Sequence, residues 1–161
     1  MEEKFKVLIS GRSRLLIRFI GHLIEGADLH PVRFSPRRPV EVDLSELESI
    51  NSVGLREFAN WSKTIKNKDF TFSHCPRVFI DQVNMIHGLL PEQAKITSFY
   101  VPFVAMKSNR EQMILYRSGL EYKLEKGGVQ LHHPEVKDET GDYYELDVIA
   151  SKYFLFLQRF A

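Results

Sequence analysis

The change of hydrophobic period at residues 50–54 constrains the fold of this chain more than any other feature. Residues 40–45 (VEVDLS) alternate apolar and polar side chains, as a half-buried strand does. After the segment INSVG, apolar residues recur at positions 55, 58, 59 and 65, which is the spacing of a helix with one apolar face. A strand that leads directly into an amphipathic helix predicts a sheet with helices packed against it.

Strand-like and helix-like segments continue to alternate on both sides of this junction. Residues 4–10 and 15–23 are β-rich runs separated by GRSR, which predicts a hairpin. Residues 70–75 predict another strand, and residues 76–88 begin with proline and end with glycine, as helices often do. We therefore expect an α/β fold, with a mixed sheet and packed helices, over residues 1–92.

The rest of the chain, residues 93–161, has a different pattern. Strand-like runs at 94–106, 111–117 and 120–133 alternate with turns, and residues 145–160 end in an apolar cluster that predicts a short docking helix. A β segment of this size buries too little surface to be stable alone. We expect a small β extension that ends in a short helix and packs on the first domain or on a partner.

The composition excludes several classes of protein. The net charge is +1, so no overall field attracts nucleic acid or anionic lipid. The single cysteine, Cys75, excludes an internal disulfide and a site built from several thiolates, and we interpret it as a buried structural thiol. Acids stand where a signal peptide has a basic region, and no apolar run reaches the ~20 residues of a membrane span. We expect a cytoplasmic protein.

Catalytic signatures are missing from the sequence. It contains no phosphate-binding P-loop, no zinc-protease motif and no nucleophile elbow. The carboxylates of residues 46–49 (ELES) and 138–142 (DETGD) are interpreted as exposed turns. We therefore expect neither enzymatic activity nor a cofactor.

The segment VEVDLSELESINSVGLREF resembles the core of STAS domains, the fold of anti-sigma factor antagonists and of the cytoplasmic tails of sulfate transporters. In that family a strand ends in a loop of the type D-S-[ST]-G that opens a helix. Here the loop reads Asn51-Ser52-Val53-Gly54, and FIDQVNMIHGLL matches the second helix. The resemblance covers about residues 5–90 and implies a STAS-like fold with a role in regulatory protein binding.

Ser52 matches the serine that a partner kinase phosphorylates in anti-sigma factor antagonists, although kinase-regulated members have Asp where this chain has Asn51. A phosphate adds nearly two negative charges, which a helix N-terminus tolerates. The alternative is that Asn51 and Ser52 only cap the helix. The resemblance implies docking of an anti-sigma factor or a histidine-kinase-like ATPase. The candidate docking residues are Asn51, Ser52, Gly54, Arg56 and Asn60.

The extension resembles the zinc-ribbon-like C-terminal part of a bacterial STAS-like group, which begins S-F-Y-x-P-Y-x-C-x-x-C and ends K-Y-F-x-F-L. This chain reads SFYVPFVAMKSNR and ends KYFLFL, without the cysteines. The expected ligand positions hold Ala105 and Ser108 in the first knuckle, and approximately Lys137 and Thr140 in the second. We therefore expect a metal-free extension that aromatic packing holds together.

Two other functions remain open. Residues 26–39 are predicted to be mostly loop and contain RFSPRRP, which is either a solvated loop or a phosphate-binding site of a sensing STAS domain. In the second case Arg33, Arg37 and Arg38 would bind a nucleotide or another small molecule. Alternatively, the extension adds a strand edge to a neighbouring chain and forms a homodimer.

Overall fold

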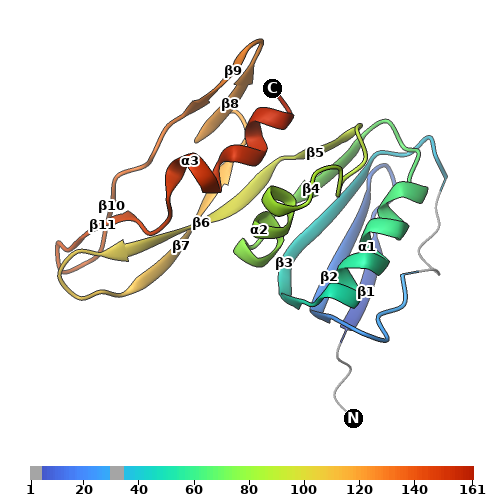
Figure 1. Cartoon of the computed structure of the whole chain (residues 1–161), viewed down its shortest axis with the longest axis horizontal. Coiled ribbons are helices and arrows are strands. Elements are labelled where there is room, and N and C mark those ends of the chain that lie inside the picture. The colour runs from blue at the N-terminus through green and yellow to red at the C-terminus, as the bar shows by residue number, and fades with distance from the viewer. Residues whose placement is uncertain (1–4, 30–34) are drawn as a thin grey trace.

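The computed structural model describes residues 5–29 and 35–161. They form a five-stranded sheet, a four-stranded sheet and a two-stranded hairpin, together with helices. Figure 1 shows the two larger sheets next to each other along the long axis of the molecule. This combination of strands and helices confirms the predicted α/β class.

The five-stranded sheet has the order β1-β2-β3-β4-β5 and mixes both strand directions. The predicted hairpin consists of β1 (Phe5–Ser10) and β2 (Leu15–Leu23), which pair antiparallel. β3 (Val40–Ile50), β4 (Phe70–Ser73) and β5 (Ala94–Ile96) continue the sheet in parallel. Parallel neighbours need crossover connections, which helices supply between β3, β4 and β5.

Two helices cover one face of this sheet (Figure 1). α1 (Ser52–Thr64) connects β3 to β4, and α2 (Arg77–Met85) connects β4 to β5, so both predicted helices are confirmed. Aromatic rings hold them to the strands: the Phe58 ring lies 5.8 Å from that of Phe72 on β4 and 5.5 Å from that of Phe79 on α2. Trp61 contacts the Phe19 ring of β2 at 5.4 Å, so α1 is packed over the middle of the sheet.

β3 is longer than the alternating pattern predicts. Residues 46–49, which we interpreted as an exposed turn, continue the strand to Ile50 beside β2. Register shifts between Arg18 and Ile20, and again further along, mark bulges that interrupt the two-residue alternation. Glu46 forms an ion pair with Arg18, and Leu47 is buried in the core. The bulged strand therefore keeps its pairing although its sequence pattern is lost.

The extension contains a sheet of order β10-β11-β6-β7, whose neighbours all pair antiparallel. Its two long strands are β6 (Ser98–Ala105) and β7 (Glu111–Arg117). The chain then forms a hairpin and closes with one short α-helix and one 3₁₀ helix, as the prediction of a short terminal helix implied. The remaining elements are β8 (Tyr122–Glu125), β9 (Gly128–Leu131), β10 (Val136–Lys137), β11 (Tyr143–Leu146), α3 (Ala150–Tyr153) and η1 (Leu155–Arg159).

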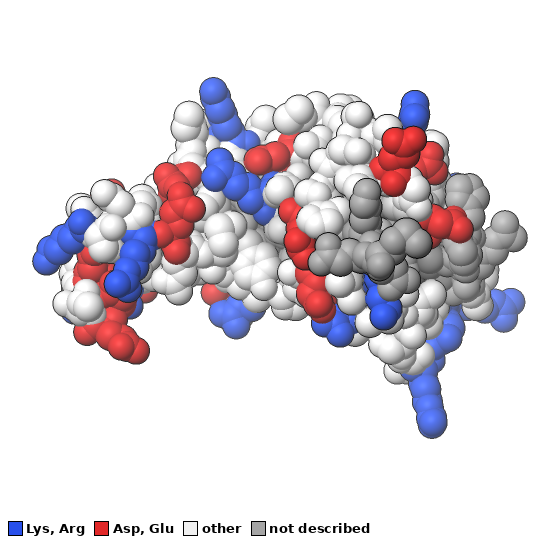
Figure 2. Space-filling view, turned by 90° about the horizontal axis from the view of Figure 1, so that it is seen from below, with Lys and Arg blue, Asp and Glu red and all other residues white. Residues whose placement is uncertain are grey.

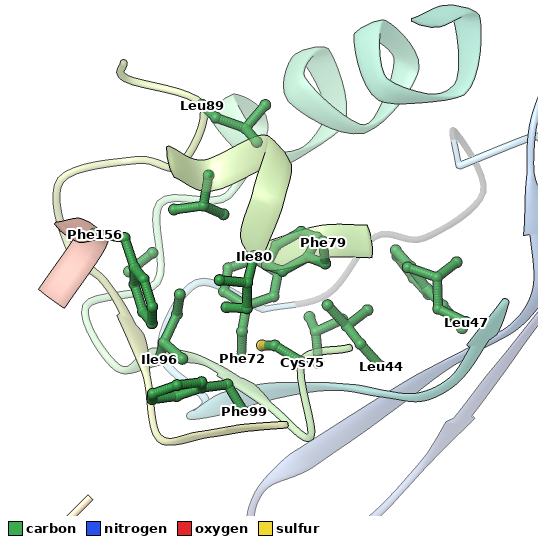
Figure 3. Packing of buried hydrophobic residues seen from close by; sticks show 14 of the residues in the cluster. Leu44, Leu47, Phe72, Cys75, Phe79, Ile80, Leu89, Ile96, Phe99 and Phe156 are labelled. Carbon is green, nitrogen blue, oxygen red and sulfur yellow. The ribbon is translucent and has the colours of Figure 1, made fainter. Parts of the chain in front are cut away.

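A single hydrophobic cluster joins the two parts, from Leu47 of β3 to Phe156 of η1 (Figure 3). The Phe99 ring of β6 lies 5.0 Å from the ring of Phe156, and both residues are fully buried. Asn84 of α2 adds polar contacts: its Nδ2 donates to the Tyr153 carbonyl at 2.9 Å, and its Oδ1 accepts from the Phe156 amide at 2.8 Å. The extension therefore packs on the first part through α2.

β5 begins at Ala94, beyond residue 92, where we placed the end of the first domain. It pairs with β4, so the first sheet takes its last strand from the segment assigned to the extension.

Within residues 5–29 and 35–161, the helices lack the combination of length and apolarity that crossing a membrane requires.

Candidate functional site

The junction between β3 and α1 is held in place by Asn51. Its Oδ1 accepts a hydrogen bond from the Gly54 amide at 2.8 Å, so Asn51 is the N-cap of α1. Its own amide donates to the carbonyl of Leu23 at the end of β2, at 3.2 Å. One residue thus fixes the start of the helix to its neighbouring strand.

Gly54 is buried where α1 passes close to the end of β2. A Cβ added at this position would lie 1.9 Å from the Leu23 carbonyl oxygen and 2.3 Å from its carbonyl carbon. Both atoms belong to the backbone, so no side chain can move aside to make room. Gly54 was predicted to be a docking residue, but this burial gives it a structural role instead. It allows the helix to begin beside β2.

Three of the other candidate docking residues lie on one exposed stripe of α1. Ser52, Arg56 and Asn60 are exposed, and their spacing of four residues places them on the same face of the helix. Since Asn51 provides the capping oxygen, the exposed Ser52 hydroxyl is not needed for capping. The stripe therefore presents a hydroxyl, a guanidinium and an amide to solvent.

The start of α1 has no acidic side chain in its own first turn, whereas the adjacent strand end carries the carboxylate of Glu48. No carboxylate of the helix itself therefore neutralises the positive end of the helix dipole. The adjacent strand ends carry a hydrogen-bonded pair, His22 Nδ1 and Ser49 Oγ at 2.8 Å, with Glu48 3.5 Å from His22 Nε2. Figure 2 views the molecule from below and shows acidic and basic side chains interspersed on this side.

Of the three arginines proposed for ligand binding, the structure describes two, Arg37 and Arg38. Arg33 lies outside the described residues. The Arg38 guanidinium donates to the carbonyls of Gly11, at 2.9 Å, and of Arg12, in the turn between β1 and β2. Arg37 is exposed. Arg38 therefore ties the loop before β3 to the hairpin, which is a structural role.

The four positions without cysteines lie at one end of the extension, in two turns that adjoin paired strands. Ala105 ends β6 and pairs with Tyr144 of β11, whereas Lys137 of β10 pairs with Tyr143. Ser108 and Thr140 occupy the turns that follow Ala105 and Lys137. In the described parts of the chain, no group of three or more His, Cys, Asp or Glu side chains is arranged to hold a metal ion.

Carboxylates hold these two turns. Asp142 is buried, and it accepts from the amides of Lys107 at 3.0 Å and Ser108 at 2.9 Å across the gap between the turns. Asp138 accepts from the Thr140 hydroxyl and from the amides of Thr140 and Asp142. The Thr140 hydroxyl bond is the main reason that the pKa of Asp138 lies below its ordinary value.

Asp142 contradicts the interpretation of residues 138–142 as an exposed turn. The sequence around Asp142 is typical of any polar turn. Asp side chains commonly accept from backbone amides in exposed turns as well, so the sequence does not show that this one is buried. The only available signal was its position after Gly141, just beyond the predicted second knuckle. Sequence reasoning therefore missed the residue that joins the two turns.

Cys75 follows β4 and is fully buried, which confirms the interpretation of a structural thiol. Burial, reinforced by the charge of Asp43, raises its pKa well above the ordinary value, so the thiol stays protonated. Neighbouring His74 has a left-handed backbone (φ 52°), and its Nδ1 lies 3.7 Å from Asp43 Oδ1. A protonated, inaccessible thiol is a poor nucleophile.

Comparison of the chain with models of protein families, with curated proteins and with solved structures finds no match.

Proposed function

We propose that this chain is a non-enzymatic, cytoplasmic regulatory module that docks another protein through the start of α1. The docking surface comprises Asn51, Ser52, Arg56 and Asn60. The resemblance of the INSVG junction to STAS domains suggests an anti-sigma factor or a histidine-kinase-like ATPase as the partner. Phosphorylation of Ser52 would switch the contact.

The observation that carries this proposal is the division of roles between Asn51 and Ser52. Asn51 already caps the helix through Gly54, so Ser52 contributes an exposed hydroxyl that the fold does not use as a cap. Arg56 and Asn60 extend the same exposed stripe by two further turns. Exposed side chains are not needed for core packing, so those of Ser52, Arg56 and Asn60 are available for recognition.

Phosphorylation at Ser52 would change this surface without disrupting the helix. The phosphate would lie at the positive end of the helix dipole, in a first turn without acids. Arg56 lies four residues further on the same stripe, close enough for its guanidinium to pair with the phosphate. The guanidinium would then be less available to an acidic group of the partner, and the surface would become negative.

Affinity capture from native lysate, with captured proteins identified by mass spectrometry, tests the proposal. Wild-type protein should recover an anti-sigma factor or a kinase-like ATPase, and Ser52→Asp and Arg56→Glu should lose it. Lys123→Glu, a charge change on the exposed side of β8, should retain it and serves as the control. With the purified partner, the two α1 variants should raise Kd at least about tenfold, which corresponds to ~1.4 kcal/mol.

Recovery of the same proteins at the same affinity by wild type, Ser52→Asp and Arg56→Glu would refute docking through α1. If Arg56→Glu weakens binding but Ser52→Asp does not, the surface is correct and the phosphorylation switch is wrong.

A further inference from the structure

β7 forms the outer edge of the four-stranded sheet. Its seven residues make it longer than the other outer strands, since β1 has six residues, β5 three and β10 two. Among the described residues it pairs along its length with β6 alone. Figure 1 shows β7 along the lower border of its sheet, away from the helices that cover the five-stranded sheet.

The hydrogen bonds at both ends of β6 and β7 show which backbone groups of β7 point outward. The Ser118 amide donates to Thr97, and the Ala105 amide donates to Arg110, each at 2.9 Å. Bonded positions recur every second residue in an antiparallel pair, so Gln112, Ile114 and Tyr116 direct their amides and carbonyls toward β6. The intervening residues, Met113 and Leu115, therefore direct theirs outward.

Within the described chain, only the last residue of β7 is covered on this edge: the Arg117 amide donates to Glu121 Oε2, and the Arg117 carbonyl accepts from the amides of Leu120 and Glu121. No feature of the β7 sequence protects the rest of the edge. Natural edge strands commonly carry a proline, a lysine or a bulge that prevents another strand from adding. β7 reads EQMILYR and pairs with β6 in unbroken register, so it has none of these features. Its charges are confined to Glu111 and Arg117 at the two ends, and Met113 in between is 43% exposed.

The strand is complementary to itself when it is reversed. In an antiparallel pair centred on Ile114, Glu111 lies opposite the partner's Arg117, and Met113 lies opposite the partner's Leu115. The first pair is oppositely charged and the second is apolar, and both kinds of cross-strand pair are stabilising. Arg117 already bonds Glu121 through its backbone amide, Nε and Nη2, but its side chain is 54% exposed, so the partner's Glu111 can still approach it.

This register also satisfies the outward backbone groups at the centre of β7. The backbone amides and carbonyls of Met113 and Leu115 point outward, so Met113 and the partner's Leu115 would exchange two hydrogen bonds. By the two-fold symmetry of the dimer, Leu115 and the partner's Met113 would exchange two more hydrogen bonds. On the same face, Met113 is opposite Pro102 of β6 and Leu115 is opposite Tyr100, so the apolar strip would continue across both chains.

We propose that a second copy of this chain adds to β7, so that two β7 strands pair antiparallel about Ile114 and join two four-stranded sheets into one. The contact lies in the extension and does not use Ser52 or the exposed stripe of α1. It therefore stands independently of the proposed docking function, and each copy in the dimer keeps a separate docking surface.

Sedimentation equilibrium across a range of micromolar concentrations tests the proposal. Wild-type protein should form a dimer, and Met113→Pro should raise the dimer dissociation constant by roughly thirtyfold, because symmetry removes two interchain hydrogen bonds. The proline should be tolerated within the chain, since the amide it removes points away from β6. Met113→Thr keeps that amide and a β-forming side chain, so it should remain dimeric.

Glu111→Lys provides a second variant that alters only an exposed side chain. It places a lysine opposite the partner's Arg117 twice in each dimer and should also raise the dissociation constant, by about tenfold. Glu139→Lys in an exposed turn of the same extension is its control and should leave the dimer unchanged. A monomeric wild-type protein, or a dimer that neither Met113→Pro nor Glu111→Lys weakens, would overturn the proposal.

Discussion

Gly54 determines how closely α1 can approach β2, because its missing Cβ leaves room for the Leu23 carbonyl. In Gly54→Ala the methyl group would overlap backbone atoms, and the helix would have to shift away from the sheet. We expect a net loss of at least about 1 kcal/mol in the free energy of unfolding, even though alanine favours helices. Urea denaturation followed by tryptophan fluorescence measures this loss.

Gly128 provides the matched control for that substitution. A Cβ built there meets no atom within 4 Å, and its backbone is outside the left-handed region. Gly128→Ala should therefore change the free energy of unfolding by less than about 0.5 kcal/mol. Equal losses for both alanine variants would show that the close contact at Gly54 is unimportant.

Asn51 and Ser52 should respond differently to removal of their polar groups. Asn51→Ala deletes the oxygen that accepts from the Gly54 amide and should cost about 1 kcal/mol. Ser52→Ala removes an exposed hydroxyl that does not cap the helix, so its stability should be nearly unchanged. Thermal unfolding of both variants distinguishes the two residues, and a larger loss for Ser52→Ala would reverse their assignment.

At the scale of elements, Asn84 connects α2 to both terminal helices. Asn84→Ala would leave the Tyr153 carbonyl and the Phe156 amide without their partner, which should destabilise the protein by about 1–3 kcal/mol. Arg77→Ala on the same helix removes only an exposed ion pair with Asp81 and should cost less than about 0.5 kcal/mol. Similar urea midpoints for the two variants would contradict this role of Asn84.

The turns at the end of the extension should depend on Asp142 in the same way. Asp142→Ala removes the acceptor of the Lys107 and Ser108 amides, so those amides should exchange with deuterium faster than in wild type. Glu139→Ala, in the exposed part of the second turn, should leave the exchange unchanged. Unaltered exchange in Asp142→Ala would mean that strand pairing alone holds the turns.

The sequence predicts the existence of most elements but not where they end or pair. The hairpin, α1 and α2 follow from hydrophobic period and from turn residues, which act over short distances along the chain. The end of β3 was missed because bulges beside β2 disrupt the alternation while pairing continues. The place of β5 in the first sheet depends on β4, a partner more than twenty residues away, which no local pattern specifies.

The candidate site was predicted in part. The exposed stripe of α1 follows from helical spacing alone, so Ser52, Arg56 and Asn60 were identified from the sequence. The role of Gly54 depends on the distance between α1 and β2, and the roles of Arg38 and Asp142 depend on which turn each one meets. Such contacts between distant segments cannot be inferred from local composition.

The whole molecule should lose stability in alkaline solution. Burial raises the pKa of Tyr116, Tyr122 and Tyr153 well above the ordinary value, and it has the same effect on Cys75. These groups stay neutral in the folded chain but ionise in the unfolded chain. Their contribution to the free energy of unfolding is therefore complete below the pKa that they have in the unfolded chain, and it falls as the pH rises above that value. Each buried tyrosine should remove about 1.4 kcal/mol per pH unit above about pH 10.

Urea denaturation at several pH values between about 8 and 11 measures this dependence. Tyr153→Phe removes one of the titrating groups, together with its bond to the Tyr100 carbonyl, and should make the decline less steep. A free energy of unfolding that stays constant above pH 10 would show that the tyrosines are accessible to hydroxide in the folded chain.

The placement of the aromatic residues gives each half of the molecule its own optical probe. The single tryptophan, Trp61, lies in the core of the five-stranded sheet, whereas the buried Tyr116, Tyr122 and Tyr153 belong to the extension. Tryptophan emission therefore reports melting of one half, and near-ultraviolet circular dichroism of the tyrosines reports melting of the other. Because one continuous core spans both halves, the two signals should change at the same temperature, and heating curves that diverge would reveal a partly folded intermediate.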